Sequence, residues 1–154
     1  MSAVKLYFAQ HGLAVNKADD PLRPLSQKGI KQTVAVAKQL HATGAPISNI
    51  YHSNKLRARQ TAEIFSSSLS LTKTTEHEHL SPNDDISLIR QHLTSANALY
   101  IGHLPHLEKL VSTLVTGNES PSIVRFQNSA IICLEKNEDM YQILFYLTPC
   151  SIDS

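Results

Sequence analysis

The sequence has few cysteines, almost no net charge and no long apolar segment, and each shortage excludes a class of protein. Its two cysteines, Cys133 and Cys150, are too few for a disulfide framework and are not spaced like zinc ligands. A net charge of +1 lacks the basic stripe typical of nucleic-acid or membrane binding. No run approaches the roughly 18 apolar residues of a membrane span, and the N-terminal apolar run, which Lys5 interrupts, is too short for a signal peptide. We therefore expect a cytoplasmic enzyme or binding domain.

The length and composition predict one domain that spans residues 1–154. Hydrophobic residues make up 42% of the chain and charged residues 18%, as in ordinary globular proteins. A chain of this size can bury about two thirds of the surface that its unfolded form exposes. Because the overall charge is balanced, any affinity for anions must come from a local group of side chains.

Short apolar runs alternate with segments of helical periodicity along the chain. Strands are expected at 4–9, 50–52, 74–79, 98–101, 129–134 and 140–147, and helices from Ser26 to Gly44, at 55–67, at 85–94 and from Pro105 to Gly117. This alternation predicts an α/β protein. Its form should be a three-layer sandwich with a mostly parallel central sheet, helices on both faces and a C-terminal antiparallel hairpin.

Four residues are expected to define the ends of these helices. Ser26 is a good N-cap for the first helix, and Ser53 or Asn54 could cap the second. Pro105 suits the first position of the last helix, and Gly117 is expected to stop it.

Two of the expected strands end in a histidine next to a glycine. The first ends in Gln10-His11-Gly12, and the strand at 98–101 is followed by Gly102-His103. In a mostly parallel sheet the carboxyl ends of the strands share one edge, where open α/β folds bind their ligands. If the two strands are neighbours, His11 and His103 face each other across one crevice. The simpler alternative is that each is an ordinary polar residue at the end of a strand.

Arg57, at the start of the second expected helix, adds a cation to this predicted crevice. A helix N-terminus already offers free backbone N–H groups and a partial positive charge. A guanidinium and two imidazoles beside it would make a compact anion site that suits a phosphoryl group. Phosphoryl transfer needs a nucleophile, positioning and stabilisation of the equatorial oxygens, and a neutral imidazole can attack phosphorus without a metal ion.

Several motifs, in order and at compatible spacing, carry a resemblance to a known family. They are AQHG at 9–12, PLRPLS-x-x-G at 21–29, S-x-x-LRA-x-QTA at 53–62, GHLP at 102–105, SAI at 129–131 and LTPC at 147–150. They resemble the histidine phosphatase (phosphoglycerate mutase-like) superfamily, and with the short length they resemble its SixA-like phosphohistidine phosphatases. The resemblance covers nearly the whole chain and implies a phosphoglycerate mutase-like form of the predicted sandwich.

The resemblance also implies roles for residues of the predicted crevice. His11 is implied to be the nucleophile, which forms a transient phosphohistidine that water hydrolyses. Arg57 is implied to clamp the phosphoryl oxygens, and His103 to stabilise the transition state from the opposite side. No cofactor and no metal ion are implied.

Further positions are expected to contact phosphate or substrate. Gly12 lets the backbone approach a bound group closely, and Gln10 and Leu104 flank the two histidines. Arg23 should sit at the mouth of the site. The prolines on either side of Leu22-Arg23 are expected to hold this dipeptide extended, because a residue before proline avoids helical angles.

Gln10 departs from the family pattern, which has arginine immediately before the nucleophilic histidine. A glutamine offers a neutral amide in place of a charged planar fork. Loss of one preorganised charged donor costs on the order of 10²–10³ in rate. Arg59 is a poor replacement because it lies about 200° around the helix from Arg57. Arg23 is the better candidate for partial compensation.

A second departure concerns the general acid. Many members of the superfamily carry a carboxylate near Glu78 and His79, which are therefore possible acids here. An imidazole leaving group depends less on a strong acid, which favours phosphohistidine over phosphate-ester substrates. His77 and His79 alternate on the expected strand and share a face, but no cysteine or aspartate stands beside them, so we expect a solvated strand and no metal site.

Together these features predict a phosphohistidine phosphatase that acts on a protein, such as a phosphotransfer domain of a signalling relay. A chain of 154 residues has little room for insertions that would roof a small-molecule pocket, so the site should be open. Two alternatives remain: a phosphate- or phosphohistidine-binding protein whose catalysis Gln10 has weakened, and a small phosphomonoesterase with another substrate. No nucleic acid, membrane or cofactor is an expected partner.

Overall fold

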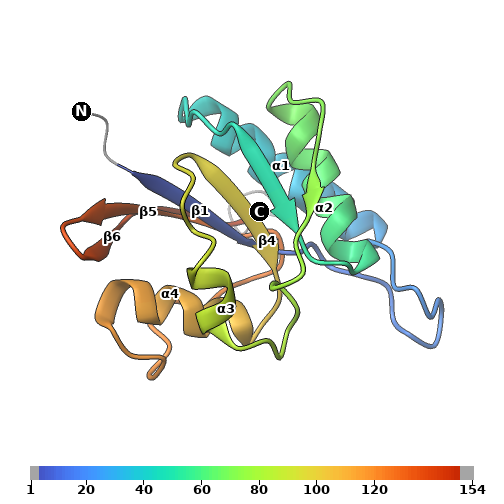
Figure 1. The fold of residues 1–154 in the computed structure, drawn as a ribbon. Helices are drawn as coiled ribbons and strands as arrows, with labels where there is room; N and C mark the ends of the chain where they lie inside the picture. Colours follow the sequence, from blue (N-terminus) through green and yellow to red (C-terminus); the bar gives the residue numbers. More distant parts are fainter. Residues whose placement is uncertain (1–3, 150–154) are drawn as a thin grey trace.

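The computed structural model describes residues 4–149 and shows one mixed sheet between helices (Figure 1). The strands are β1 (Lys5–Gln10), β2 (Asn49–His52), β3 (Thr75–Glu76), β4 (Ala98–Gly102), β5 (Ile131–Asn137) and β6 (Met140–Leu147). The helices are α1 (Gln27–Ala42), α2 (Leu56–Ser68), α3 (Ile86–Arg90) and α4 (His106–Thr116). Within residues 4–149, none of these helices combines the length and the apolar character needed to cross a bilayer. Cys150, the last residue of the LTPC motif, lies outside the described residues.

The sheet has six strands in the order β3-β2-β4-β1-β5-β6. The first four of these pair in parallel, whereas β5 is antiparallel to both β1 and β6. The predicted α/β architecture, with a C-terminal antiparallel hairpin, is confirmed. β1 and β4 are neighbours, and Gln10 lies opposite Gly102. The residues that follow these two strands therefore leave the sheet side by side.

Alternating side chains of β1 build a core on each face of the sheet. Leu6 and Phe8 pack with the inner faces of α3 and α4, whereas Tyr7 and Ala9 pack with those of α1 and α2. All four side chains are buried. β4 is buried along its whole length, as expected for a parallel strand covered on both faces. The two cores hold β1 and β4 in place, and so fix where these strands end and where the residues of the site begin.

The helix ends agree with the sequence prediction in part. The Ser26 hydroxyl accepts the N–H of Gly29 at the start of α1, and Gly117, with a φ of 87°, ends α4. Pro105 occupies the N-cap position of α4 and precedes its first helical residue. The N-cap of α2 is Lys55, so the expectation of Ser53 or Asn54 is wrong.

β3 and α3 are both shorter than the sequence predicts. β3 is an edge strand that pairs only with the end of β2, and its ladder stops where β2 stops at His52. α3 gives way to turns with tighter i to i+3 bonds, from His92 N–H to the Ile89 carbonyl at 2.8 Å and from Leu93 N–H to the Arg90 carbonyl at 3.4 Å. The helical pattern in the sequence therefore continues past the last α-helical residue.

Candidate active site

The backbone of His11 is fixed from both neighbouring strands. Its N–H donates to the Gly102 carbonyl at 3.1 Å, which extends the pairing of β1 with β4. Its carbonyl accepts Asn128 Nδ2 at 3.1 Å and the Ser129 N–H at 3.3 Å. Ser129 has a φ of 69°, a left-handed conformation that residues other than glycine rarely adopt and that often marks a functional site. The imidazole is thus attached to a tightly held segment.

The imidazole of His11 is held as one tautomer. Its Nδ1 lies 2.7 Å from the carbonyl oxygen of Gly12. Because a carbonyl can only accept, Nδ1 carries the proton and Nε2 keeps its lone pair. Burial, with a smaller contribution from the charges of Arg57 and Arg23, lowers the pKa of His11 to about 4, against the opposing effect of the Gly12 bond. The ring is therefore neutral near pH 7, with Nε2 available as a nucleophile.

His103 faces His11 and is held by a serine. The two ring centroids are 4.9 Å apart, and His103 Nε2 lies 2.6 Å from the buried Ser53 Oγ. Ser53 Oγ accepts the Lys55 N–H at 3.3 Å and has one hydrogen and one further lone pair for His103 Nε2. When the hydroxyl donates to Nε2, the ring proton lies on Nδ1, a buried atom that has no hydrogen-bond partner within the protein. Burial, followed by nearby His11 and Arg57, lowers the pKa of His103 to about 3.

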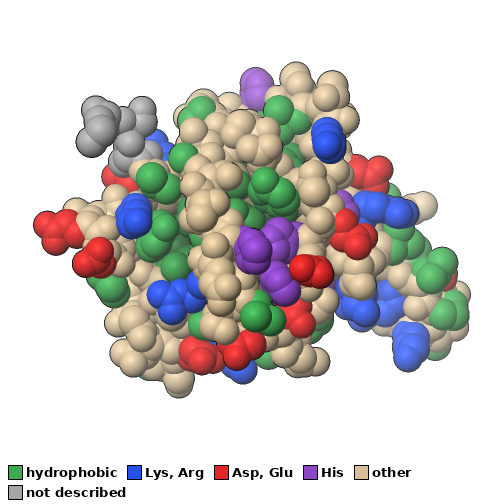
Figure 2. Space-filling model, viewed as in Figure 1, with side chains coloured by type: hydrophobic (Ala, Val, Ile, Leu, Met, Phe, Trp, Pro, Cys, Tyr) green, Lys and Arg blue, Asp and Glu red, His purple; other side chains and the backbone are tan. Residues whose placement is uncertain are grey.

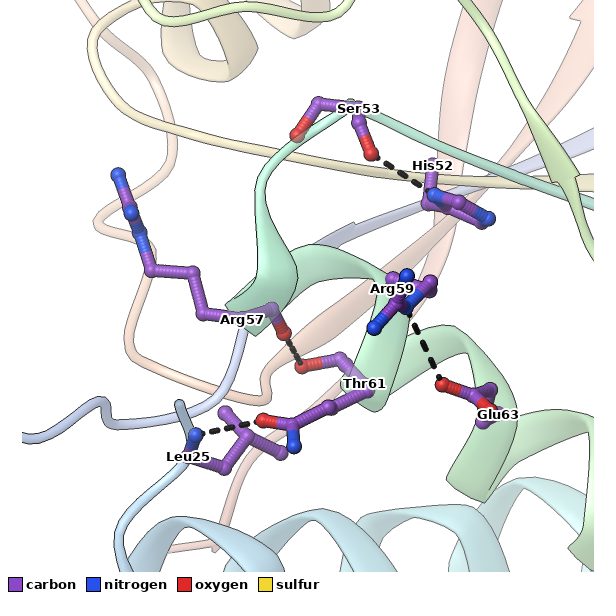
Figure 3. Close-up of polar contacts among 8 residues, drawn as sticks. Leu25, His52, Ser53, Arg57, Arg59, Thr61 and Glu63 are labelled. Atoms are coloured by element: carbon purple, nitrogen blue, oxygen red, sulfur yellow. Dashed lines mark hydrogen bonds and ion pairs between the residues drawn. The ribbon is translucent and has the colours of Figure 1, made fainter. Parts of the chain in front are cut away.

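Arg57 extends from the first turn of α2 (Figure 3). Its buried Nε has no hydrogen-bond partner within the protein, and burial together with the charge of Arg23 lowers its pKa. The Thr61 hydroxyl donates to the Arg57 carbonyl at 2.7 Å and accepts the Gly12 N–H at 2.9 Å. One threonine therefore joins the start of α2 to the turn after β1.

Arg59 leaves α2 in another direction, as its position on the helix predicts. It lies 3.7 Å from Glu63, one turn further along the helix (Figure 3). The cations close enough to affect His11 are Arg57 and Arg23.

Arg23 occupies a turn, so the prediction of an extended dipeptide is wrong. Its φ is 48°, and its N–H donates to the Asp20 carbonyl at 3.0 Å. The Asp20 carboxylate also accepts the Leu22 N–H at 3.0 Å, and this Asp-centred turn overrides the preference set by the following proline. Within the turn, Arg23 Nε donates to the Val15 carbonyl at 3.0 Å. The guanidinium is thereby anchored near His11 and Arg57.

Gln10, Gly12 and Leu104, the other predicted phosphate contacts, differ in their surroundings. The buried Gln10 Oε1 has no hydrogen-bond partner within the protein. The Gly12 N–H is engaged with Thr61, and a Cβ on Gly12 would lie 2.7 Å from Thr33 Oγ1. Leu104 lines a cavity of about 530 Å³ with Glu108 and residues 122–126, and packs against the core. Gly12 and Leu104 therefore have packing roles in the structure, and their contact with phosphate or substrate stays a prediction.

The two possible acids belong to a cluster of histidines, which Figure 2 shows as a purple group near the centre of one face. The rings of His77, His79 and His92 lie 5.3 to 5.6 Å from one another, and His79 Nε2 is 3.5 Å from the exposed Glu78 carboxylate. Burial, then the neighbouring His92 and His79, lowers the pKa of His77. Among the described residues, no three His, Cys, Asp or Glu side chains are arranged to hold a metal ion.

Sequence reasoning missed several residues that hold the site together. Ser53 and Thr61 both stand in the S-x-x-LRA-x-QTA motif, and Ser53 directly follows β2 at the sheet edge where His11 and His103 lie. Its position at that edge indicates that Ser53 can contact the two histidines. Asn128 and Ser129 precede β5. Ser129 opens the SAI motif, whereas nothing in the local pattern indicates the contact of Asn128 with His11.

Comparison with known proteins identifies the family. Residues 6–81 match the sequence profile of the histidine phosphatase superfamily (branch 1). An uncharacterised protein of Picosynechococcus sp. (strain ATCC 27264 / PCC 7002 / PR-6) is 32% identical over 123 residues, which are 74% of each chain. The chain belongs to the histidine phosphatase superfamily. It is therefore related to hydrolases, and the resemblance found in its motifs is confirmed.

SixA-like members of the superfamily match nearly the whole chain. The phosphohistidine phosphatase SixA of Escherichia coli (strain K12) is 26% identical over 157 aligned positions, covering 97% of this chain and 96% of SixA. A solved structure of the protein histidine phosphatase SixA complexed with tungstate superimposes with a TM-score of 0.85 at 27% identity, covering 96% of this chain and 99% of that one. The phosphoglycerate mutase-like fold is thereby confirmed.

Proposed function

We propose that the protein is a phosphohistidine phosphatase that removes a phosphoryl group from a protein phosphohistidine through a covalent phospho-His11. One arrangement carries the proposal. Neutral His11 has a free Nε2 and faces His103, beside two buried N–H groups, His103 Nδ1 and Arg57 Nε, that lack partners within the protein. Leaving a buried donor unpaired costs about 1–3 kcal/mol. A bound phosphoryl group would satisfy both donors.

In the first step, the lone pair of His11 Nε2 forms a bond to phosphorus as the P–N bond of the substrate breaks. The leaving imidazole takes up one proton from solvent water, and the His11 ring becomes positively charged while Nδ1–H stays bonded to the Gly12 carbonyl. Arg57 and His103 donate to the equatorial oxygens, where charge accumulates in the transition state. When the Ser53 hydroxyl donates to His103 Nε2, the ring is the tautomer that donates from Nδ1.

In the second step, water attacks phosphorus and the bond to His11 Nε2 breaks. The electron pair of the P–N bond returns to Nε2, one proton of the attacking water passes to a phosphate oxygen, and inorganic phosphate leaves. The proposed chemistry uses a neutral imidazole nucleophile and N–H donors, and so needs neither a metal ion nor a cofactor.

A protein substrate is supported by the relatives and by the chemistry of the leaving group. The related Escherichia coli protein is named a phosphohistidine phosphatase, and the related SixA structure holds tungstate, an oxyanion like phosphate. An imidazole leaving group depends less on a strong acid than an alkoxide does, and the possible acids Glu78 and His79 lie 3.5 Å from each other in the histidine cluster. We infer a cytoplasmic phosphorelay protein, such as a phosphotransfer domain, as the substrate.

Gln10 supports a second candidate, a member of the family with weakened catalysis that binds phosphohistidine. Its amide presents an oxygen, buried and without a partner, at a position where the family has a cation. Rotation of the amide by 180° would present N–H groups to an anion instead, but without a charge. The expected consequence is slower turnover with binding retained.

Hydrolysis assays with a phosphohistidine protein, free phosphohistidine and an aryl phosphate test the proposal. Wild-type protein should release phosphate from phosphohistidine, and His11→Ala should abolish this. His41→Ala, which removes an exposed imidazole at the end of α1, is the matched control and should retain activity. Activity that survives His11→Ala would reject the mechanism. Tungstate binding without turnover by the wild type would favour the second candidate.

A further inference from the structure

A surface cavity adjoins the candidate active site at Arg57. A cavity of about 440 Å³ lies between the turn at Pro21 and Leu22 and the first turn of α2. Arg57 forms part of its wall, and the same residue influences the pKa of His11. We call this cavity the side groove. Because Arg57 belongs to both the candidate active site and the wall of the side groove, a macromolecule that presents a phosphohistidine to His11 can place its neighbouring residues over the groove.

The wall of the side groove is cationic. Lys55, Arg57 and Arg59 line it together with uncharged residues. Several Lys and Arg side chains lie at the right of Figure 2, with acidic side chains beside them. Arg59 lies 3.7 Å from Glu63, but both side chains are 59% exposed, and such surface pairs are weak. The charge of Arg59 thus remains available to a partner.

An exposed leucine borders the same groove. Leu22 is 71% exposed, and its backbone is fixed by the bond from its N–H to the Asp20 carboxylate. An apolar side chain held on a fixed turn costs little conformational entropy when a partner covers it. The groove therefore combines positive charge with one apolar contact, a pattern that fits an acidic protein surface carrying an apolar side chain.

We propose that the side groove docks the residues that flank the phosphohistidine of the protein substrate, and that it selects flanks rich in carboxylates. The inference rests on the proposed function, because the partner is the protein that His11 dephosphorylates. Carboxylates on the substrate would lie against Lys55 and Arg59 while Arg57 holds the phosphoryl group. Complementary charge raises the association rate and disfavours basic partners.

Two synthetic phosphohistidine peptides of equal length test the inference, one flanked by glutamates and the other by glutamines. Free phosphohistidine is the third substrate. Wild-type protein should show about tenfold higher kcat/KM for the glutamate peptide, and added salt should narrow this preference because exposed charges are screened. Lys55→Gln/Arg59→Gln should remove the preference and leave hydrolysis of free phosphohistidine within about twofold. The matched control, Lys38→Gln/Lys136→Gln, removes two exposed cations elsewhere and should keep it.

The outcomes separate this inference from the proposed function. Equal kcat/KM for the two peptides in the wild type, or an undiminished preference in Lys55→Gln/Arg59→Gln, would overturn the docking role while His11 chemistry stands. An equal loss on all three substrates in that variant would assign the groove to the reaction centre and would also overturn docking. A wild type that hydrolyses none of the three would remove both the proposed function and the inference.

Discussion

Replacing Gln10 by arginine should accelerate hydrolysis, and the structure allows the size of the effect to be worked out. Gln10 ends β1 opposite Gly102 and directly precedes His11. Its Oε1 is buried without a partner, a state that costs about 1–3 kcal/mol. Arginine removes this acceptor and supplies charged donors next to the reacting phosphoryl group. Since one preorganised donor is worth about 10²–10³ in rate, and glutamine keeps a neutral amide there, we expect Gln10→Arg to raise kcat by about 10²-fold.

The same substitution should lower the thermal stability of the protein without bound ligand. Arg57 and Arg23 already lower the pKa of His11 through their charges, and Arg23 lowers that of Arg57. A third guanidinium adds to this repulsion until an anion binds. We therefore expect Gln10→Arg to unfold at a lower temperature than the wild type without ligand, and to gain more thermal stability from tungstate.

Phosphate release from free phosphohistidine and from an aryl phosphate measures the rate, and thermal unfolding with and without tungstate measures binding. Gln10→Met is the matched control, because it keeps the length of the side chain and removes its hydrogen-bonding groups. Slower turnover in Gln10→Met would show that the amide contacts the phosphoryl group, whereas unchanged turnover would show that it only fills space. A Gln10→Arg protein that folds and binds tungstate but hydrolyses no faster would refute the reasoning.

Four further predictions concern the neutral imidazoles and the residues around them. The lowered pKa of His11, about 4, predicts that kcat/KM, corrected for substrate ionisation, stays level down to about pH 5; an acid limb near 6.5 would contradict this. The imidazoles of His11 and His103 take up a proton near pH 6.5 in the unfolded chain but only at lower pH in the folded protein. The free energy of unfolding in urea should therefore be highest above pH 6.5 and should decrease as the pH falls towards the folded pKa values. Ser53→Ala should lower kcat about tenfold with little change in KM and alter the pH profile through His103, whereas a purely structural serine would change only the unfolding midpoint. Gly12→Ala should cost about 1–3 kcal/mol in urea unfolding by overpacking, and Gly102→Ala, whose Cβ would meet its nearest atoms at 3.6 Å, should cost less.

The predictable part of the site follows from strand geometry. Parallel neighbouring strands end at one edge, so histidines placed directly after β1 and β4 had to meet once those strands were adjacent. The ring separation of 4.9 Å between His11 and His103 is the result. The two-faced core was predictable for the same reason, because side chains of a strand alternate between its faces.

The unpredicted part depends on side chains that had two possible partners. Ser53 is a good N-cap by type, but its hydroxyl contacts the buried His103 imidazole as well as the Lys55 N–H, and α2 has Lys55 as its N-cap. Asp20 bends the backbone at Leu22 and places Arg23 at a positive φ, against the preference of a residue before proline. Such outcomes depend on tertiary contacts that a local pattern does not contain.

The charge distribution of the site gives Gln10 a physical rationale. Both imidazoles are neutral because they are buried beside guanidinium groups. An arginine at position 10 would lower the pKa of His11 further and would increase the repulsion that anion binding must relieve. Glutamine removes that repulsion and leaves His11, the proposed nucleophile, neutral and oriented by its bond to the Gly12 carbonyl. In the proposed mechanism the glutamine therefore weakens transition-state stabilisation while His11 Nε2 keeps its lone pair, which favours a slow phosphatase over an inert binding protein.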